Sequence, residues 1–285
     1  MSVFDKFNNF KMDAEKQISS EDKEQLERFQ EIYESTLLYY KKVRDLYKEE
    51  QKKYTEKDSQ YISSYFSMRA SDLGVIDTVK KLQTSFPLII YSYFSNKYKV
   101  DLDDRDKSDK FNKIHTYSPS EDEINELFEK RHYKPILDDI IGQLGGMTFN
   151  DVSIQQIKDK MKNACSYGRG GNWHIEVKNA IVKYKGWTGV NQWREEFSIR
   201  INDFLEILPS VLGLMEFGDS KMGFSRLRQY YDMKIDYDEM KNGIEFPECE
   251  KIALIKFFQN GNINLKFKKP EYAREFVSDY CGYSL

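Results

Sequence analysis

The sequence predicts an α+β fold, in which a long N-terminal helical arm precedes a mixed domain with a small antiparallel sheet and packed helices. Apolar residues recur at helical spacing in the first third, where no glycine or proline occurs between residues 20 and 72. After about residue 172 they alternate at strand spacing. An Asn-Gly pair between two apolar runs predicts a β-hairpin near the C-terminus. We therefore expect a helical arm at 1–115 and an α+β domain at 116–285.

Composition narrows the class of this 285-residue chain. Hydrophobic residues make up 40% and charged residues 32%, which excludes collagen-like and disordered chains. The formal net charge is -3, so the basic excess typical of nucleic-acid-binding proteins is absent. The longest apolar run, Phe86 to Tyr91, is far shorter than the roughly 20 residues of a membrane helix, and the N-terminus lacks a signal-peptide pattern. We expect a cytoplasmic protein without a membrane segment.

The arm is expected to begin near Ser19, because Glu21 and Asp22 suit the first turn of a helix. The helix carries an aromatic seam, formed by Leu26, Phe29, Tyr33, Tyr40, Val43 and Tyr47. Such a seam needs a partner in water. One partner would be a second helical block at about 59–97, bent at Pro87; the other would be another subunit. The hairpin alternative would close on Tyr61, Tyr65, Met68 and Leu73.

A polar stretch of mixed charge at 101–110 is expected to separate the two parts. Ser120 and Glu123 then have capping-box spacing, in which each side chain accepts a hydrogen bond from a backbone N–H group at the helix start. The helix that they open should be bent or divided by Pro135 and end at Gly145-Gly146. Beyond it we expect strands at 173–177 and 180–184, a helix from about Asn202, and the hairpin.

A two-residue turn at Asn260-Gly261 sets the expected register of the hairpin. Phe258 would face Ile263, and Leu254 would face Phe267. The apolar face would then contain Ile252, Leu254, Phe258, Ile263, Leu265 and Phe267. Lys256 would intrude on that face as its one charged residue. Pro270 should begin a terminal helix, since proline suits the first helical turn.

Glu176 and Lys178 are the candidate catalytic residues, because they share one face of a predicted strand. They resemble the strand pair of PD-(D/E)xK nucleases, in which the carboxylate binds Mg²⁺ and the ammonium assists the attacking water. That site also needs an upstream Asp on a neighbouring strand, whereas Asp151 falls at a predicted helix start. Alternatively, Glu176 and Lys178 belong to the solvated face of an ordinary strand. Under this interpretation we expect no enzyme activity.

Other short motifs fail to complete a site. Cys165, Cys249 and Cys281 share no metal-ligand spacing with one another or with the three histidines, so we expect free thiols and no metal. The glycines at 168–171 lie between a helix and a strand, the reverse of the order in a phosphate-binding loop. We therefore expect no cofactor.

Stretches rich in tyrosine and lysine are candidate contact surfaces. Tyrosine adds a large contact area at small entropic cost, which favours contact with other proteins. Rings beside charges would also suit single-stranded nucleic acid, and an ordinary surface is the third alternative. The candidate interface residues are Phe29, Tyr33, Tyr40, Tyr47, Tyr230 and Tyr231.

The chain from about Cys165 onward resembles the DUF4942 family of phage and mobile-element domains, which are often encoded with DNA methyltransferases. The matching segments are Tyr184-Lys-Gly-Trp187, the helical stretch around 202–208, and Ile255-Lys-Phe-Phe-Gln-Asn-Gly-Asn-Ile-Asn-Leu-Lys-Phe267. These are structural motifs, so the resemblance implies a fold and a phage context rather than an activity. A methyltransferase motif is absent from the sequence.

In size and layout the chain also resembles the Gabija anti-defence proteins of Bacillus phages. That resemblance implies a non-enzymatic homo-oligomer in the host bacterial cytosol, which wraps a host defence nuclease complex and blocks DNA binding and cleavage. The alternative is a nucleic-acid-binding accessory module of a phage DNA modification or replication system, with a divergent metal-dependent nuclease centre at Glu176 and Lys178.

Overall fold

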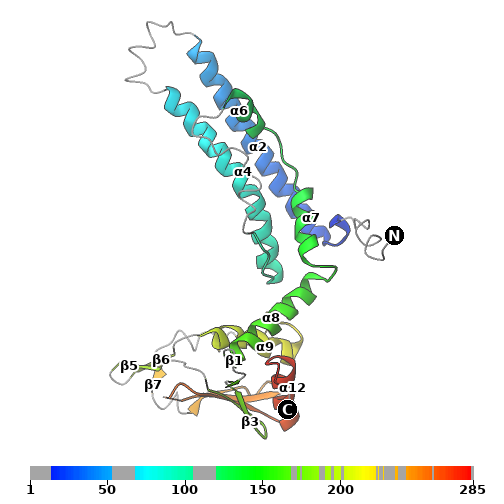
Figure 1. Ribbon diagram of the computed structural model, residues 1–285, viewed down its shortest axis with the longest axis vertical. Coiled ribbons are helices and arrows are strands. Elements are labelled where there is room, and N and C mark those ends of the chain that lie inside the picture. The colour runs from blue at the N-terminus through cyan, green and yellow to red at the C-terminus, as the bar shows by residue number, and fades with distance from the viewer. Residues whose placement is uncertain are drawn as a thin grey trace. The chain divides into compact units, whose positions relative to one another are not determined.

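The computed structural model contains two compact units, Met1–Phe149 and Asn150–Leu285 (Figure 1). The residues it describes are 14–52, 68–104, 120–167, 172–173, 175–185, 190–193, 196–199, 202–222, 224, 227, 235–236, 242–258 and 260–283. The architecture is α+β, as the sequence predicts. The boundary differs from the expected division after residue 115, because the helices between 121 and 143 pack against the N-terminal unit.

A helical hairpin forms the N-terminal unit. Its long helices, α2 (Ser20–Gln51) and α4 (Met68–Tyr98), lie side by side, and α4 continues through Pro87 (Figure 1). Phe29 and Tyr33 of the aromatic seam pack on α4, and the Tyr33 and Phe86 rings stack at 4.2 Å between centroids. The hairpin prediction is therefore confirmed. Of its expected contacts, Tyr61 and Tyr65 and the side chains of Met68 and Leu73 lie outside the described residues.

Capping boxes begin two helices of this unit where the sequence places them. Ser19 Oγ accepts a hydrogen bond from the Asp22 backbone N–H at 3.1 Å, and the Asp22 carboxylate accepts one from the Ser19 N–H at 3.0 Å. Ser120 and Glu123 form the same pair at the start of α6 (Glu121–Leu127). Pro135 lies in the first turn of the next helix, α7 (Lys134–Gln143), which a short 3₁₀ helix, η1 (Ala14–Lys16), contacts.

Two buried glutamines fasten the segment between α6 and α7 to the hairpin. Gln30 of α2 donates to the Arg131 carbonyl at 2.7 Å and accepts from the Tyr133 N–H at 2.9 Å. Gln83 of α4 donates to the Leu127 and Glu129 carbonyls and accepts from the Tyr33 hydroxyl at 2.9 Å. Because each glutamine satisfies backbone groups of a loop, α6 and α7 belong with the hairpin rather than with the sheet.

A five-stranded antiparallel sheet with the order β3-β4-β10-β9-β8 is the centre of the C-terminal unit. Its strands are β3 (Ile175–Lys178), β4 (Ile181–Tyr184), β8 (Ile244–Glu245), β9 (Ile252–Phe257) and β10 (Ile263–Phe267). The helices of this unit are α8 (Phe149–Cys165), α9 (Asp203–Phe217) and α12 (Pro270–Asp279). Smaller sheets pair β1 (Ser166–Tyr167) with β2 (Asn172–Trp173), and β6 (Glu196–Ile199) with β5 (Val190–Trp193) and β7 (Ile235–Asp236).

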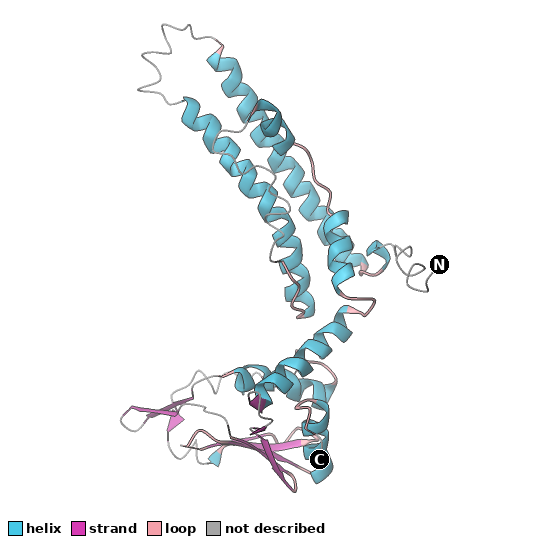
Figure 2. Cartoon of the chain, viewed as in Figure 1, coloured by secondary structure: helices cyan, strands magenta, loops and turns pink. Residues whose placement is uncertain are grey.

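Helices cover one face of the five-stranded sheet (Figure 2). Val182, Ile255 and Leu265 from that face share one apolar core with residues of α8, α9 and α12. The three cysteines are buried in this unit and are free thiols, as predicted. Asn202 caps α9 and Pro270 begins α12, which confirms both expected helix starts. No helix in the described part of the chain combines the length and the apolar character that crossing a bilayer requires.

The register of the β9–β10 hairpin differs by one residue from the prediction. Ile263 pairs with Phe257 and Leu265 with Ile255, so the loop is one residue longer than a two-residue turn. Gly261 takes a positive φ of 78° there, the position that a three-residue loop reserves for glycine. The register therefore buries Ile255 and Phe257 in place of Leu254 and Phe258. An irregularity beside Phe267 returns Ile252 to the buried face.

Candidate binding surfaces

Two of the predicted interface residues of the arm, Phe29 and Tyr33, pack against α4. Tyr33 is only 2% exposed, so its ring is unavailable to another protein. Phe29 is half-buried and meets the Tyr93 ring edge-on at 5.7 Å between centroids. Tyr40 and Tyr47 are also half-buried. The remaining two candidates, Tyr230 and Tyr231, lie outside the described residues.

A different face of α2 presents large apolar side chains to solvent. Ile32, Tyr39 and Leu46 are 55%, 61% and 62% exposed, and they are spaced by seven residues. Thr36 and Val43 are half-buried and lie between them. These five residues, which we name the outer stripe, therefore alternate at spacings of four and three along the helix. That repeat is the heptad pattern with which helices pair in coiled coils.

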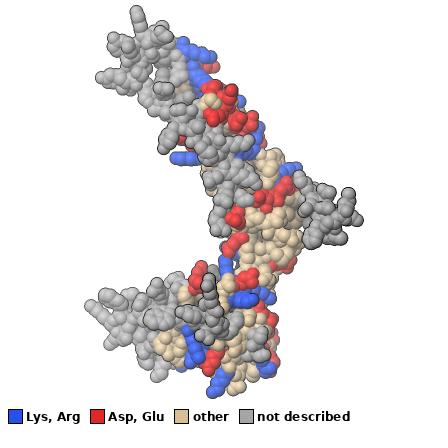
Figure 3. All heavy atoms as spheres, viewed as in Figure 1, with Lys and Arg blue, Asp and Glu red and all other residues tan. Residues whose placement is uncertain are grey.

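Local hydrogen bonding keeps the outer stripe apolar. The Thr36 hydroxyl donates to the Ile32 carbonyl at 2.7 Å, so its methyl group can face outward without an unsatisfied polar atom. The Tyr39 ring meets the Tyr40 ring edge-on at 5.3 Å between centroids. Elsewhere, basic and acidic side chains are interspersed over the visible face of both units (Figure 3). The outer stripe is thus an apolar seam on an otherwise charged helix.

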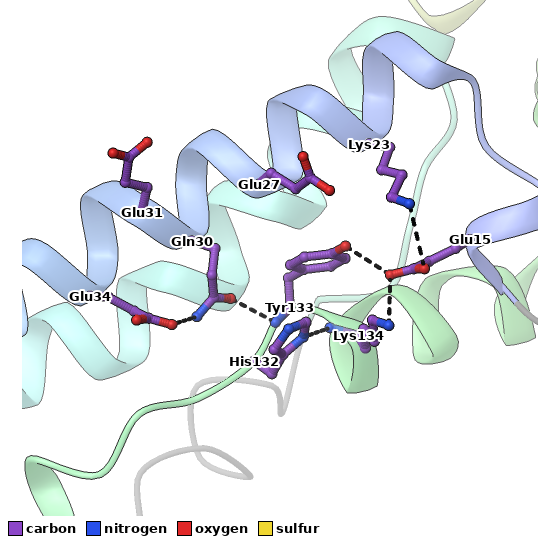
Figure 4. A pocket seen from close by; sticks show the side chains of 9 residues that line it. All are labelled: Glu15, Lys23, Glu27, Gln30, Glu31, Glu34, His132, Tyr133 and Lys134. Atoms are coloured by element: carbon purple, nitrogen blue, oxygen red, sulfur yellow. Dashed lines mark hydrogen bonds and ion pairs between the residues drawn. The ribbon is translucent and has the colours of Figure 1, made fainter.

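A hollow of about 480 Å³ lies beside the start of the hairpin (Figure 4). Its walls are charged, but several of these groups bind one another across it. Glu15 accepts from the Tyr133 hydroxyl at 2.8 Å and pairs with Lys134 at 3.1 Å, and these contacts lower the pKa of Glu15. Gln30 accepts a hydrogen bond from the backbone N–H of Tyr133, which lines the hollow. We interpret these contacts around the hollow as structural, because they hold η1 and α7 against α2.

The nuclease candidates Glu176 and Lys178 both lie on β3 with exposed side chains. Glu176 Oε2 pairs with Lys185 Nζ at 2.8 Å, and this contact, with Lys183 and Lys178 at longer range, lowers the pKa of Glu176. Asp151 lies in the first turn of α8 rather than on a strand. Among the described residues, no three acidic, histidine or cysteine side chains come together to hold a metal ion.

The face of the five-stranded sheet that the helices leave uncovered carries a set of lysines. Its lysines, which we name the lysine face, are Lys178 of β3, Lys183 of β4, Lys185 after β4, Lys256 of β9 and Lys266 of β10. All are exposed or half-buried. Strand pairing sets Lys183 and Lys256 on either side of Asn264, and Ile181 beside both Lys178 and Lys266.

Sequence reasoning missed this surface because of the hairpin register. With a two-residue turn, Leu254, Lys256 and Phe258 fall on the buried face. The observed register places all three on the uncovered face, beside Asn264 and Lys266. The position of Lys256 in the middle of the expected apolar face was the signal that could have indicated the longer loop and the shifted register.

No family model matches the chain, and no curated protein or solved structure is significantly similar to it.

Proposed function

We propose that this protein is a phage-encoded, non-enzymatic inhibitor, which forms a homo-oligomer and binds a Gabija-type defence nuclease complex in the host bacterial cytosol. Binding would block the access of DNA to that complex and hence its cleavage. The observation that carries the proposal is the outer stripe, because an exposed heptad repeat on a long helix is suited to contact with another helix. The resemblance in size and layout to the Gabija anti-defence proteins supplies the partner.

A second copy of this chain is the occupant that we assign to the outer stripe. The charged residues that flank it favour an antiparallel pair of α2 helices. With Thr36 of one copy opposite Tyr39 of the other, Arg28 and Glu49 flank the seam on the same side, so that Arg28 of each copy lies within two residues of direct register with Glu49 of the other. Arg28 and Glu49 are exposed, so these attractive pairs need no rearrangement of the hairpin. The stripe from Ile32 to Leu46 would give a seam about 21 Å long.

Replacing Tyr39 with glutamate should therefore separate the oligomer. Tyr39 is 61% exposed in the single chain, so the substitution should leave the hairpin folded while burying two charges at the centre of the pair. We expect the dissociation constant, measured by sedimentation equilibrium, to rise at least about a hundredfold.

Leu38→Glu is the matched control, because Leu38 is 51% exposed on the same helix but lies outside the outer stripe. That variant should associate as the unaltered chain does. A chain that is monomeric at every concentration, or equal losses in both variants, would contradict the assignment of the outer stripe.

The inhibitor itself is tested with a purified Gabija-type nuclease complex and its DNA substrate. Addition of the unaltered protein should lower DNA cleavage. The protein should also co-elute with the complex in size-exclusion chromatography. Tyr39→Glu should inhibit less than Leu38→Glu if oligomerisation is needed. Undiminished cleavage at saturating inhibitor concentration would refute the proposed function and would leave the oligomer assignment standing on the sedimentation data.

A further inference from the structure

The lysine face offers a second binding surface that shares no residue with the outer stripe and does not rest on the proposed function. Among the described residues, the acidic side chains on the same face are Glu176 and Glu245. Five lysines and two glutamates give this described part of the face a net charge of +3, against -3 for the chain. Glu176 is already paired with Lys185. A surface of opposite sign to the whole molecule attracts anionic partners selectively to one place.

Strand pairing spreads these lysines into a regular array. One row across the sheet contains Glu176, Lys183, Asn264 and Lys256. The next row contains Lys178, Ile181, Lys266, Leu254 and Glu245. Since neighbouring strands lie about 4.8 Å apart, the two lysines of each row are about 10 Å apart. The positive charge is therefore distributed, as a polymer of phosphates would require, rather than concentrated for a single ion.

One group on this face is suited to a base rather than to a phosphate. Phe258 follows β9 and is half-buried, with Lys256 Nζ 5.6 Å from its ring centroid. An aromatic ring beside ammonium groups is the combination on which single-stranded nucleic acids stack their bases.

We propose that the lysine face binds single-stranded nucleic acid, with its lysines on the phosphates and Phe258 against a base. Duplex DNA fits this face less well. Five strands about 4.8 Å apart span about 19 Å, which is wider than the roughly 12 Å major groove, so the sheet cannot enter it. A single strand is flexible enough to follow a flat sheet and to present its bases.

The test compares two triple variants of the full chain that remove the same net charge. Lys183→Gln, Lys256→Gln and Lys266→Gln together alter the lysine face. Lys160→Gln, Lys162→Gln and Lys269→Gln alter exposed lysines elsewhere, and the first two lie on α8, which covers the opposite face of the sheet. Binding to a fluorescein-labelled single-stranded oligonucleotide is measured by anisotropy against salt concentration, and circular dichroism confirms that each variant is folded.

The unaltered chain should bind the single strand, with log K falling linearly against log salt. Because each neutralised phosphate contributes about -0.7 to that slope, the face variant should flatten it by about 2 and weaken binding about a hundredfold at 0.1 M salt. The control variant should keep both values. Equal losses in the two variants, tighter binding to a duplex of the same sequence, or no salt-dependent binding would each overturn the proposal.

Discussion

Replacing Asp22 with alanine should destabilise the helical unit by roughly 3 kcal/mol. Asp22 is fully buried and lies where the start of α2 meets the end of α4. Its carboxylate pairs with Lys97 at 2.8 Å and accepts hydrogen bonds from the hydroxyls of Tyr93 and Tyr98, as well as from Ser19. Alanine would leave these donors without their acceptor and would remove one side of the capping box.

Glu21→Ala provides a matched control for this prediction. Glu21 pairs with the same Lys97 Nζ, at 2.7 Å, but its side chain is 79% exposed. An exposed ion pair contributes less than about 1 kcal/mol, so this variant should unfold at nearly the same urea concentration as the unaltered chain. Urea titrations followed by circular dichroism measure both variants. Similar midpoints for Asp22→Ala and Glu21→Ala would show that burial of the carboxylate does not matter.

The same carboxylate makes the stability of the helical unit sensitive to acid. Burial alone would raise the pKa of Asp22, but hydrogen bonds from Lys97, Ser19, Tyr98 and Tyr93 outweigh it and lower the pKa from 3.8 to about 2. The folded state therefore gains stability from the ionised form above pH 3.8 and loses it as the pH falls towards 2. The free energy of unfolding should therefore fall by roughly 2 kcal/mol over this pH range. Asp22→Asn should abolish that part of the pH dependence.

Replacing Gly213 with alanine should destabilise the C-terminal unit by roughly 2 to 3 kcal/mol, despite the better helix propensity of alanine. Gly213 lies inside α9, and the chain after that helix folds back over it. A Cβ atom at this position would lie 2.6 Å from the Met222 carbonyl oxygen and 2.7 Å from that of Asp219. Both oxygens belong to the backbone, so the loop would have to move as a whole.

Gly142→Ala in α7 is the control for Gly213→Ala, because it makes the same substitution at a position where a Cβ atom has open space around it. Nothing lies within 4 Å of a Cβ atom there. Alanine should therefore add up to about 1 kcal/mol of stability by its helix propensity alone. Thermal and urea unfolding of the two variants should thus shift in opposite directions. A neutral effect of Gly213→Ala would mean that residues 219 to 222 do not hold the position described above.

Features encoded by a few adjacent residues could be predicted from the sequence. The helix start near Ser19, the capping box at Ser120 and the proline at the start of α12 each depend on contacts within one helical turn, and all are observed. The packing of α2 on α4 could also be predicted, because the second helical block is the next helix along the chain. The domain boundary could not be predicted, because it depends on Gln30 and Gln83, which donate to backbone carbonyls 101 and 44 residues away along the chain.

The candidate surfaces required the tertiary structure. The periodicity of α2 contains two apolar stripes, and only packing against α4 shows that Tyr33 lies inside while Tyr39 lies outside. The lysine face depends on one residue of loop length between β9 and β10, which decides the side of the sheet on which Lys256 falls. Glu176 and Lys178 were placed correctly on a strand, but their neighbours on the sheet could not be read from the sequence.

The burial of all three cysteines makes each of them slow to react with thiol reagents while the C-terminal unit stays folded. Burial raises the pKa of Cys249 to about 11, and burial together with a hydrogen bond to Cys165 raises the pKa of Cys281, so little reactive thiolate forms near neutral pH. The sequence before Cys165 contains no cysteine. Alkylation of the native chain would consequently record the opening of residues 150–285 alone, without any engineered label.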